Sequence, residues 1–137
     1  MSKEINQAAL GKFAEAVNSG NFDIFDQVVA PDCVDHDPAA GQIVGPAGYR
    51  MFFSGMRAAF PDMAVALETM VANDDTIAFA YTLTGTHKGP LMGTPPSGRK
   101  VSIRGLQISK FKGGKMVERW GSSDELTLLK QIGAIPS

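Results

Sequence analysis

The apolar residues of this chain change their spacing once, near residue 61, and that change restricts the folds open to it. Before it they recur every three or four residues, as on one face of a helix; beyond it they alternate with polar residues, as on a strand. Helices followed by strands build an α+β domain, in which helices cover an antiparallel sheet. At 137 residues, about the usual size of one domain, the chain is predicted to form a single α+β domain over residues 1–137.

The first half of the chain predicts three helices. They are expected over residues 4–19, 22–29 and 46–60. Gly20 and Pro31 suit the ends of the first two, and Pro46 suits the first turn of the third, where its missing N–H would have no helical partner. Between the second and third helices lies a short polar stretch followed by residues typical of a loop.

The second half predicts a four-stranded antiparallel meander and a short final helix. The strands are expected over 63–71, 77–86, 99–112 and 115–121, and the helix begins at about 124. Gly113-Gly114 is typical of a hairpin turn, and segment 88–98, rich in proline and glycine, predicts a loop. We expect the sheet to curve around the helices as a cone and to enclose an apolar cavity of the kind that binds small molecules.

The charge balance argues against several partners. Thirteen Lys and Arg residues against fourteen Asp and Glu give a formal charge of −1, which leaves no basic footprint for nucleic acid or an anionic membrane. The N-terminal residues lack the apolar region of a signal peptide, and no run approaches the roughly 18 apolar residues of a membrane span. We expect a cytoplasmic protein whose single cysteine, Cys33, is a small buried residue.

The stretch Asp35-His36-Asp37 is the first candidate site. These residue types bind metals, but neighbours on a strand point to opposite faces, so at most two of the three share one centre. The other histidine, His87, is far along the chain. We therefore predict no metal site and expect Asp35 or His36 to line the mouth of a pocket.

Polar residues also stand at strand positions that are usually apolar. Gln107 shares a strand face with Ser109, and on the next strand Arg119 lies opposite Trp120. A glutamine that faces inward needs hydrogen-bond partners, which a ligand or ordered water supplies. Alternation alone leaves open which face is turned inward. The predicted substrate-binding residues are Gln107, Tyr81, Arg119, Trp120, Phe53 and Met92.

The face opposite Gln107 predicts self-association. It carries Leu106 and Ile108, and the next strand adds Trp120. Left open, these residues would form an exposed apolar patch, so we expect a homodimer.

Several motifs together resemble the SnoaL-like polyketide (ester) cyclases. They are GTHKG at 85–89, GTPPSGR at 93–99, FKGGK at 111–115, and ERWGSSD at 118–124 followed by LKQIG at 129–133. The likeness extends over nearly the whole chain. It implies the cone-shaped α+β barrel shared with scytalone dehydratase and ketosteroid isomerase, usually as a homodimer, with neither metal nor organic cofactor.

The resemblance also implies a reaction. In such cyclases an aspartate on the last strand removes a proton α to a carbonyl, a histidine on the preceding strand helps to hold the enolate, and the carbanion closes a ring by an aldol step. In this sequence Gly121 falls at the position of the aspartate and Gln107 at that of the histidine. Asp35 falls near an asparagine of the family site.

Two classes of function follow. The first is a cofactor-free cyclase or isomerase acting on a small hydrophobic carbonyl compound. Its base would be Asp35 or Asp124, with Gln107 and His36 orienting the substrate or stabilising the enolate. The serine pair before Asp124 and the leucine run after it favour a helix cap at this position, so Asp35 is preferred over Asp124 as the base.

The second class is a non-catalytic module that binds a small molecule, which the replacements at Gly121 and Gln107 favour. A further alternative is hydrolysis of an epoxide or lactone by a carboxylate-activated water. That reaction would use Arg104 or Arg119 together with Asp35.

Overall fold

The computed structural model describes residues 2–136 as four α-helices, one 3-10 helix and five strands. The helices are α1 (Ser2–Ser19), η1 (Phe22–Ile24, the 3-10 helix), α2 (Phe25–Val28), α3 (Pro46–Ala59) and α4 (Glu125–Gln131). The strands are β1 (Val29–Asp35), β2 (Ala64–Ala72), β3 (Thr76–Thr86), β4 (Lys100–Lys112) and β5 (Lys115–Ser123). The predicted α+β class is confirmed.

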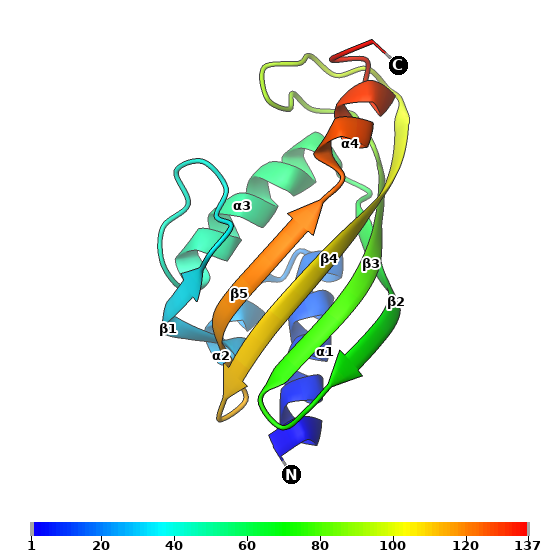
Figure 1. Cartoon of the computed structure of the whole chain (residues 1–137). Coiled ribbons are helices and arrows are strands. Elements are labelled where there is room, and N and C mark those ends of the chain that lie inside the picture. Colours follow the sequence, from blue (N-terminus) through cyan, green and yellow to red (C-terminus); the bar gives the residue numbers. More distant parts are fainter. Residues whose placement is uncertain (1, 137) are drawn as a thin grey trace.

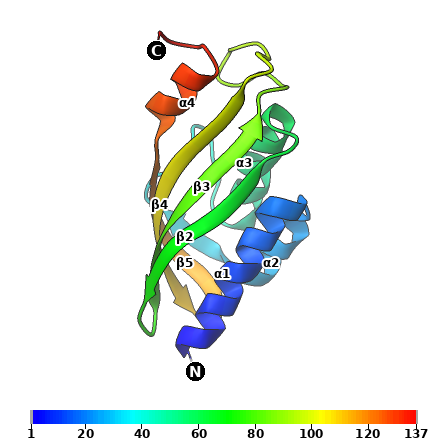
Figure 2. The same cartoon turned by 90° about the vertical axis from the view of Figure 1, so that its right-hand side faces the viewer.

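The strands form one curved, open sheet in the order β1-β5-β4-β3-β2. The antiparallel meander β2–β5 matches the prediction. Helices α1, α2 and α3 lie against the concave face, while α4 lies beyond the end of β5 (Figures 1 and 2). The opposite, convex face carries no helix in these views. None of the helices within residues 2–136 has the length and hydropathy needed to cross a bilayer.

The predicted four-stranded sheet is wrong by one strand. β1 pairs in parallel with β5, with Val34 opposite Glu118 and Asp35 opposite Arg119. The second predicted helix correspondingly ends at Val28 rather than 29, after η1 and one α-turn. Apolar residues on both sides of this boundary continue the helical spacing, which hides the change. Pro31 is tolerated because β1 is an edge strand and needs no second partner.

The core lies between the helices and the concave face. Aromatic rings from α1, α2 and α3 meet there, with Phe13 4.9 Å from Phe25 and 5.6 Å from Tyr49, centroid to centroid. On β4 every odd-numbered residue from Val101 to Phe111 is buried and every even-numbered one is exposed. Gln107 therefore faces the helices, which answers the question that alternation left open.

The motif at 85–89 has a structural role at the β3–β4 loop. His87 is fully buried, and the backbone N–H of Ser97 donates to its Nδ1 at 3.1 Å. Backbone hydrogen bonds also join His87 to Arg99 and Gly98. The histidine thus ties together the two ends of the loop over 88–99.

Candidate active site

Five hydrogen-bonded side chains form a polar group against the concave face, which we call the inner cluster: Asp35, Tyr49, Gln107, Ser109 and Arg119. Arg119 Nη1 lies 3.1 Å from both carboxylate oxygens of Asp35, and Arg119 Nε donates to Gln107 Oε1 at 2.9 Å. Gln107 Nε2 donates to Ser109 Oγ at 2.9 Å, and the Tyr49 hydroxyl donates to Asp35 Oδ2 at 2.9 Å. The cluster joins α3 to three strands.

Strand register explains why these residues meet. The parallel pairing of β1 with β5 sets Asp35 beside Arg119, and the antiparallel pairing of β4 with β5 sets Ser109 opposite Arg119. The parallel ladder ends just beyond, where the N–H of His36 donates to the Arg119 carbonyl at 2.8 Å. Gln107 lies two residues from Ser109 on β4 and therefore on the same face.

The side-chain oxygens of Asp35 act as acceptors in all of its hydrogen bonds. Its side chain is 7% exposed, against 18% for Arg119. The Asp37 N–H donates to Oδ1 at 2.9 Å, and Gln42 Nε2 approaches Oδ2 at 3.4 Å. A largely buried charge needs this pairing, because an unpartnered one would be strongly destabilising.

Burial fixes the protonation of two neighbours. Desolvation raises the pKa of the Tyr49 hydroxyl far above its ordinary 10.0, so this group remains a donor to Asp35. Desolvation also raises the pKa of Cys33 from 9.0 to about 11, so the thiol stays protonated near neutral pH and is a poor nucleophile or metal ligand. Within residues 2–136, no group of three His, Cys, Asp or Glu side chains is placed to hold a metal.

His36 does not join Gln107 as the sequence suggested. Alternation along β1 turns it away from Asp35, and its ring stacks on Trp120 with centroids 4.5 Å apart. His36 Nε2 also lies 2.9 Å from Glu118 Oε2. Both ring systems are therefore placed outside the inner cluster.

Asp124 is placed at the N-terminus of α4 and not in the inner cluster. Its carboxylate accepts from the backbone N–H and the hydroxyl of Thr127, and these hydrogen bonds hold the pKa of Asp124 below its ordinary value. The residue is exposed. The structure thus favours the capping role over that of a base.

The remaining predicted site residues lie in different parts of the molecule. Tyr81 is half-buried and lies on the same face of the sheet as Gln107, whereas the exposed Arg104 lies on the opposite face. Phe53 packs in the aromatic core, 5.7 Å from Phe25 between centroids. Met92 is 60% exposed in the β3–β4 loop.

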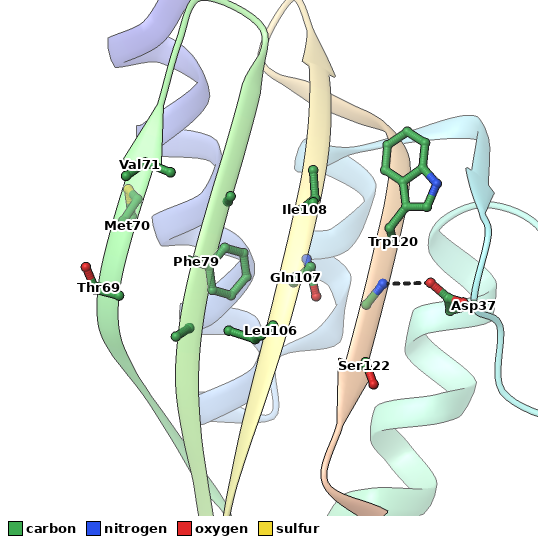
Figure 3. A pocket seen from close by; sticks show the side chains of 13 residues that line it. Asp37, Thr69, Met70, Val71, Phe79, Leu106, Gln107, Ile108, Trp120 and Ser122 are labelled. Atoms are coloured by element: carbon green, nitrogen blue, oxygen red, sulfur yellow. Dashed lines mark hydrogen bonds between the residues drawn. The ribbon is translucent and has the colours of Figure 1, made fainter.

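The convex face carries an open hollow of about 570 Å³, which we call the outer hollow. Figure 3 shows Trp120, Leu106 and Ile108 along it, and the Asp37 carboxylate accepting from the Gly121 N–H, at 2.9 Å. The hollow is mainly apolar, and its projecting side chains come from the face opposite the inner cluster. The predicted pocket residue Trp120 therefore belongs to this outer surface.

Sequence reasoning missed Tyr49, a member of the inner cluster, and Gln42, which approaches Asp35 from outside it. Tyr49 lies among apolar residues at helical spacing on α3, and this spacing gives no sign that its hydroxyl meets Asp35. Gln42 lies in the loop between β1 and α3, where no sequence pattern singles it out. Only the parallel β1–β5 pairing, with some eighty residues between the partners, brings Asp35 to this group.

Comparison with known proteins agrees with the sequence motifs. The family model for SnoaL-like polyketide cyclase matches residues 7–132. Nogalonic acid methyl ester cyclase of Streptomyces nogalater is 29% identical over 86% of this chain and 90% of its own length. Aklanonic acid methyl ester cyclase DauD of Streptomyces sp. (strain C5) is 25% identical over 89% and 78%.

Solved structures agree over nearly the whole chain. TsrD of Streptomyces laurentii superimposes with a TM-score of 0.90 at 25% identity, covering 98% of this chain and 99% of its own. IdmH of Streptomyces antibioticus superimposes with a TM-score of 0.82 at 30% identity, covering 93% and 98%. The resemblance drawn from the motifs is confirmed.

Proposed function

The chain belongs to the SnoaL-like polyketide cyclase family, and on that premise we propose that it is a cofactor-free cyclase that acts on a polyketide carbonyl compound at the inner cluster. The observation that carries this proposal is the Asp35–Arg119 pair, a nearly buried carboxylate and guanidinium held on the concave face. Such a pair offers a proton acceptor beside a fixed positive charge, which suits chemistry through an enolate.

The proposed reaction is an intramolecular aldol addition. Asp35 accepts the proton from a carbon α to a carbonyl, and the C–H electron pair becomes the enolate. The enolate carbon attacks a ketone or aldehyde carbon of the same molecule, forming a C–C bond as the C=O π bond opens to an alkoxide. The proton on Asp35 returns to the alkoxide, so atoms and charge balance without an oxidant, reductant or metal.

The contacts of Asp35 indicate how a substrate reaches it. Arg119, Tyr49 and the Asp37 N–H hold the carboxylate at 2.9–3.1 Å, whereas Gln42 approaches only to 3.4 Å and comes from the loop after β1. Displacing this weakest donor frees one lone pair of Oδ2 at the smallest cost. The other donors keep the carboxylate oriented while it accepts the proton.

The relatives support a class of substrate. Nogalonic acid methyl ester and aklanonic acid methyl ester are the compounds in the names of the two related cyclases. Aromatic residues packed against the core on this side of the sheet, among them Tyr81 and Phe53, suit a flat hydrophobic molecule. We propose the methyl ester of a polyketide acid as substrate, which is a small hydrophobic carbonyl compound.

Hydrolysis of an epoxide or lactone receives less support. That chemistry needs two carboxylates around one arginine, one to activate the water and one to assist ring opening. Within residues 2–136, the Arg119 guanidinium forms an ion pair with Asp35 alone, and Arg104 faces the other side of the sheet.

We also propose that two copies associate through their convex faces. Leu106 is 58% exposed and Ile108 is 45% exposed there. The surrounding rim holds both signs of charge, with Lys110 near Trp120 and Glu118 beside it, so that the same patch can meet itself across a two-fold axis. Association with a second copy of the chain would bury these exposed apolar residues, and no different protein would be needed to cover them.

Turnover of the two methyl esters tests the proposed function. The purified protein is expected to convert at least one ester to a ring-closed product, detected by chromatography and mass spectrometry. Asp35→Asn is expected to lower kcat by about 10²–10⁴-fold, the usual contribution of a general base. The matched control Asp124→Asn keeps an oxygen at the helix cap and should retain the wild-type rate.

The outcomes separate the two classes of function. Stoichiometric binding of the esters without product would favour the non-catalytic module. Full turnover by Asp35→Asn would overturn the assignment of the base. Loss of turnover in Asp124→Asn alone would return that residue to the mechanism.

A further inference from the structure

Two glycines on the concave face lie beneath the side chains of other residues. A Cβ atom added to Gly105 on β4 would overlap the Tyr81 ring and its hydroxyl. A Cβ atom added to Gly121 on β5 would come within 2.7 Å of the Arg119 Cζ and overlap Nη2. Tyr81 and Arg119 can occupy these places only because both positions lack a side chain.

Strand register brings the two glycines close together. Tyr81 pairs with Gly105, and Gly121 pairs with Gln107, the next inward residue on β4. Gly105 and Gly121 are therefore diagonal neighbours on adjacent strands, a relation that spans about 7–8 Å. Tyr81 comes from one side of this corner and Arg119 from the other, so both side chains cover the same small area of the sheet.

Each of these side chains keeps one free donor. Arg119 uses Nε for Gln107 and Nη1 for Asp35, while its Nη2 makes no hydrogen bond with residues 2–136. The Tyr81 hydroxyl likewise has no hydrogen-bond partner within the described chain. Neither atom is among the sealed, unpaired polar atoms of the described residues, so both keep access to solvent or ligand. Because both donors are accessible and have no partner in the described chain, an acceptor from outside can bind both at this corner.

The donors at this corner suit an anionic oxygen. Burial raises the pKa of the Tyr81 hydroxyl, which therefore remains protonated and able to donate, and Arg119 opposes that rise by its positive charge. Asp35 and Gln107 fix the guanidinium from two sides, so Nη2 needs no rearrangement before it meets a ligand. Donors fixed in advance are the arrangement that stabilises a developing negative charge.

We propose that Tyr81 Oη and Arg119 Nη2 form a two-donor site for an anionic oxygen, built over Gly105 and Gly121. The ligand class is a planar molecule with an enolate or phenolate oxygen. The assignment of this oxygen to the enolate of the cyclisation rests on the proposed function, whereas the binding of an anionic oxygen does not. Gly105 and Gly121 are then positioning residues, because a side chain at either would displace a donor.

A chromogenic phenol tests the site without any turnover. 4-Nitrophenol changes absorbance on ionisation, so titrating it in the presence of excess protein gives the pKa of the bound phenol. Wild-type protein is expected to bind the phenolate about 10–100-fold more tightly than the phenol, lowering the bound pKa by about one to two units. Tyr81→Phe should reduce that preference about tenfold, since a hydrogen bond to a charged group is lost.

Glycine variants supply the matched control. Gly121→Ala should displace the guanidinium and reduce the preference, whereas Gly55→Ala adds a methyl group with nothing within 4 Å and should leave it unchanged. Thermal unfolding checks that each variant folds. If Gly121→Ala does not fold, Tyr81→Phe, which removes one oxygen only, still decides the question.

The outcomes distinguish this inference from the proposed function. Phenolate preference that Tyr81→Phe reduces, without turnover of any methyl ester, keeps the anionic-oxygen site and removes the cyclase proposal. Equal binding of phenol and phenolate by the wild type overturns the site even if esters are cyclised. Where cyclisation is observed, Tyr81→Phe should lower kcat about 10²-fold with little change in KM, and an unchanged kcat would remove the enolate role.

Discussion

The two faces of β4 reverse their usual polarity at residues 106–109. On the concave face, Gln107 is 6% exposed and Ser109 is fully buried, whereas on the convex face Leu106 is 58% exposed and Ile108 is 45% exposed. A half-buried strand normally shows the opposite arrangement, with apolar residues inside and polar residues outside. We infer that residues 106–109 serve a role other than packing of the sheet.

Elsewhere on the same strand the usual arrangement holds. Val101, Ile103 and Phe111 are buried, while Arg104 and Lys110 are exposed. The reversal is therefore local, and each half has its own explanation. Inside, polar residues support the Asp35–Arg119 pair; outside, apolar residues form the surface that we assign to a second copy.

Removing the positive charge of Arg119 from the concave face should lower the free energy of unfolding more than any of the other substitutions below. Arg119→Met leaves the Asp35 carboxylate largely buried without its cation and is expected to cost about 3–5 kcal/mol in the free energy of unfolding. Urea denaturation measures this loss. The double variant Arg119→Met/Asp35→Leu should recover much of it, because both charges are gone. A single variant that loses less than about 1 kcal/mol would contradict a tight, buried pair.

Charging the convex face should break association without weakening the fold. Ile108→Lys places a cation at the centre of the proposed interface and is expected to raise the dimer dissociation constant at least 100-fold, about 2.7 kcal/mol. Sedimentation equilibrium measures this constant, and Ser102→Lys, on the same face of β4 but outside the outer hollow, serves as control. A wild-type protein that is monomeric at high concentration would leave the exposed apolar patch without its proposed partner.

Exchanging the polarity of two adjacent residues compares the faces directly. Gln107→Leu leaves Arg119 Nε and Ser109 without their partner and should cost about 1–3 kcal/mol, although it adds an apolar group to the interior. Leu106→Gln, on the exposed side, should change the free energy of unfolding by no more than about 0.5 kcal/mol in the monomer. Equal changes in the free energy of unfolding for the two variants would mean that the reversed polarity of residues 106 and 107 does not affect stability.

Much of the fold could be predicted from the sequence because its signals are local. The change of hydrophobic period located the α-to-β boundary, and Gly113-Gly114 located the β4–β5 hairpin. β1 was missed because it follows one turn of helix without any change in apolar spacing. Its parallel partner, β5, lies far along the chain, so that no local pattern identifies the pairing.

The candidate site was predicted only in part, for the same reason. Asp35, Gln107 and Arg119 stood out as polar residues in regular elements, and the structure brings them together. His36 was grouped with them by sequence proximity, but alternation along β1 turns it to Trp120. Tyr49 was missed because its ring satisfies the helical apolar pattern while its hydroxyl serves the site.

The smallest expected effect compares the pH dependence of the free energy of unfolding for a buried thiol, Cys33, and for an exposed thiol on the convex face. The pKa of Cys33 is raised from 9.0 to about 11 by burial, so between these pH values the folded chain keeps a proton that the unfolded chain loses. The free energy of unfolding should therefore fall as pH rises through that window, by roughly 1 kcal/mol between pH 9 and 10. Subtracting the values for Cys33→Ala isolates this slope from the titration of lysines and tyrosines. In a Cys33→Ala background, the exposed thiol of Ile108→Cys should add no slope, because its pKa is the same in both states; a slope there would mean that the convex face is covered.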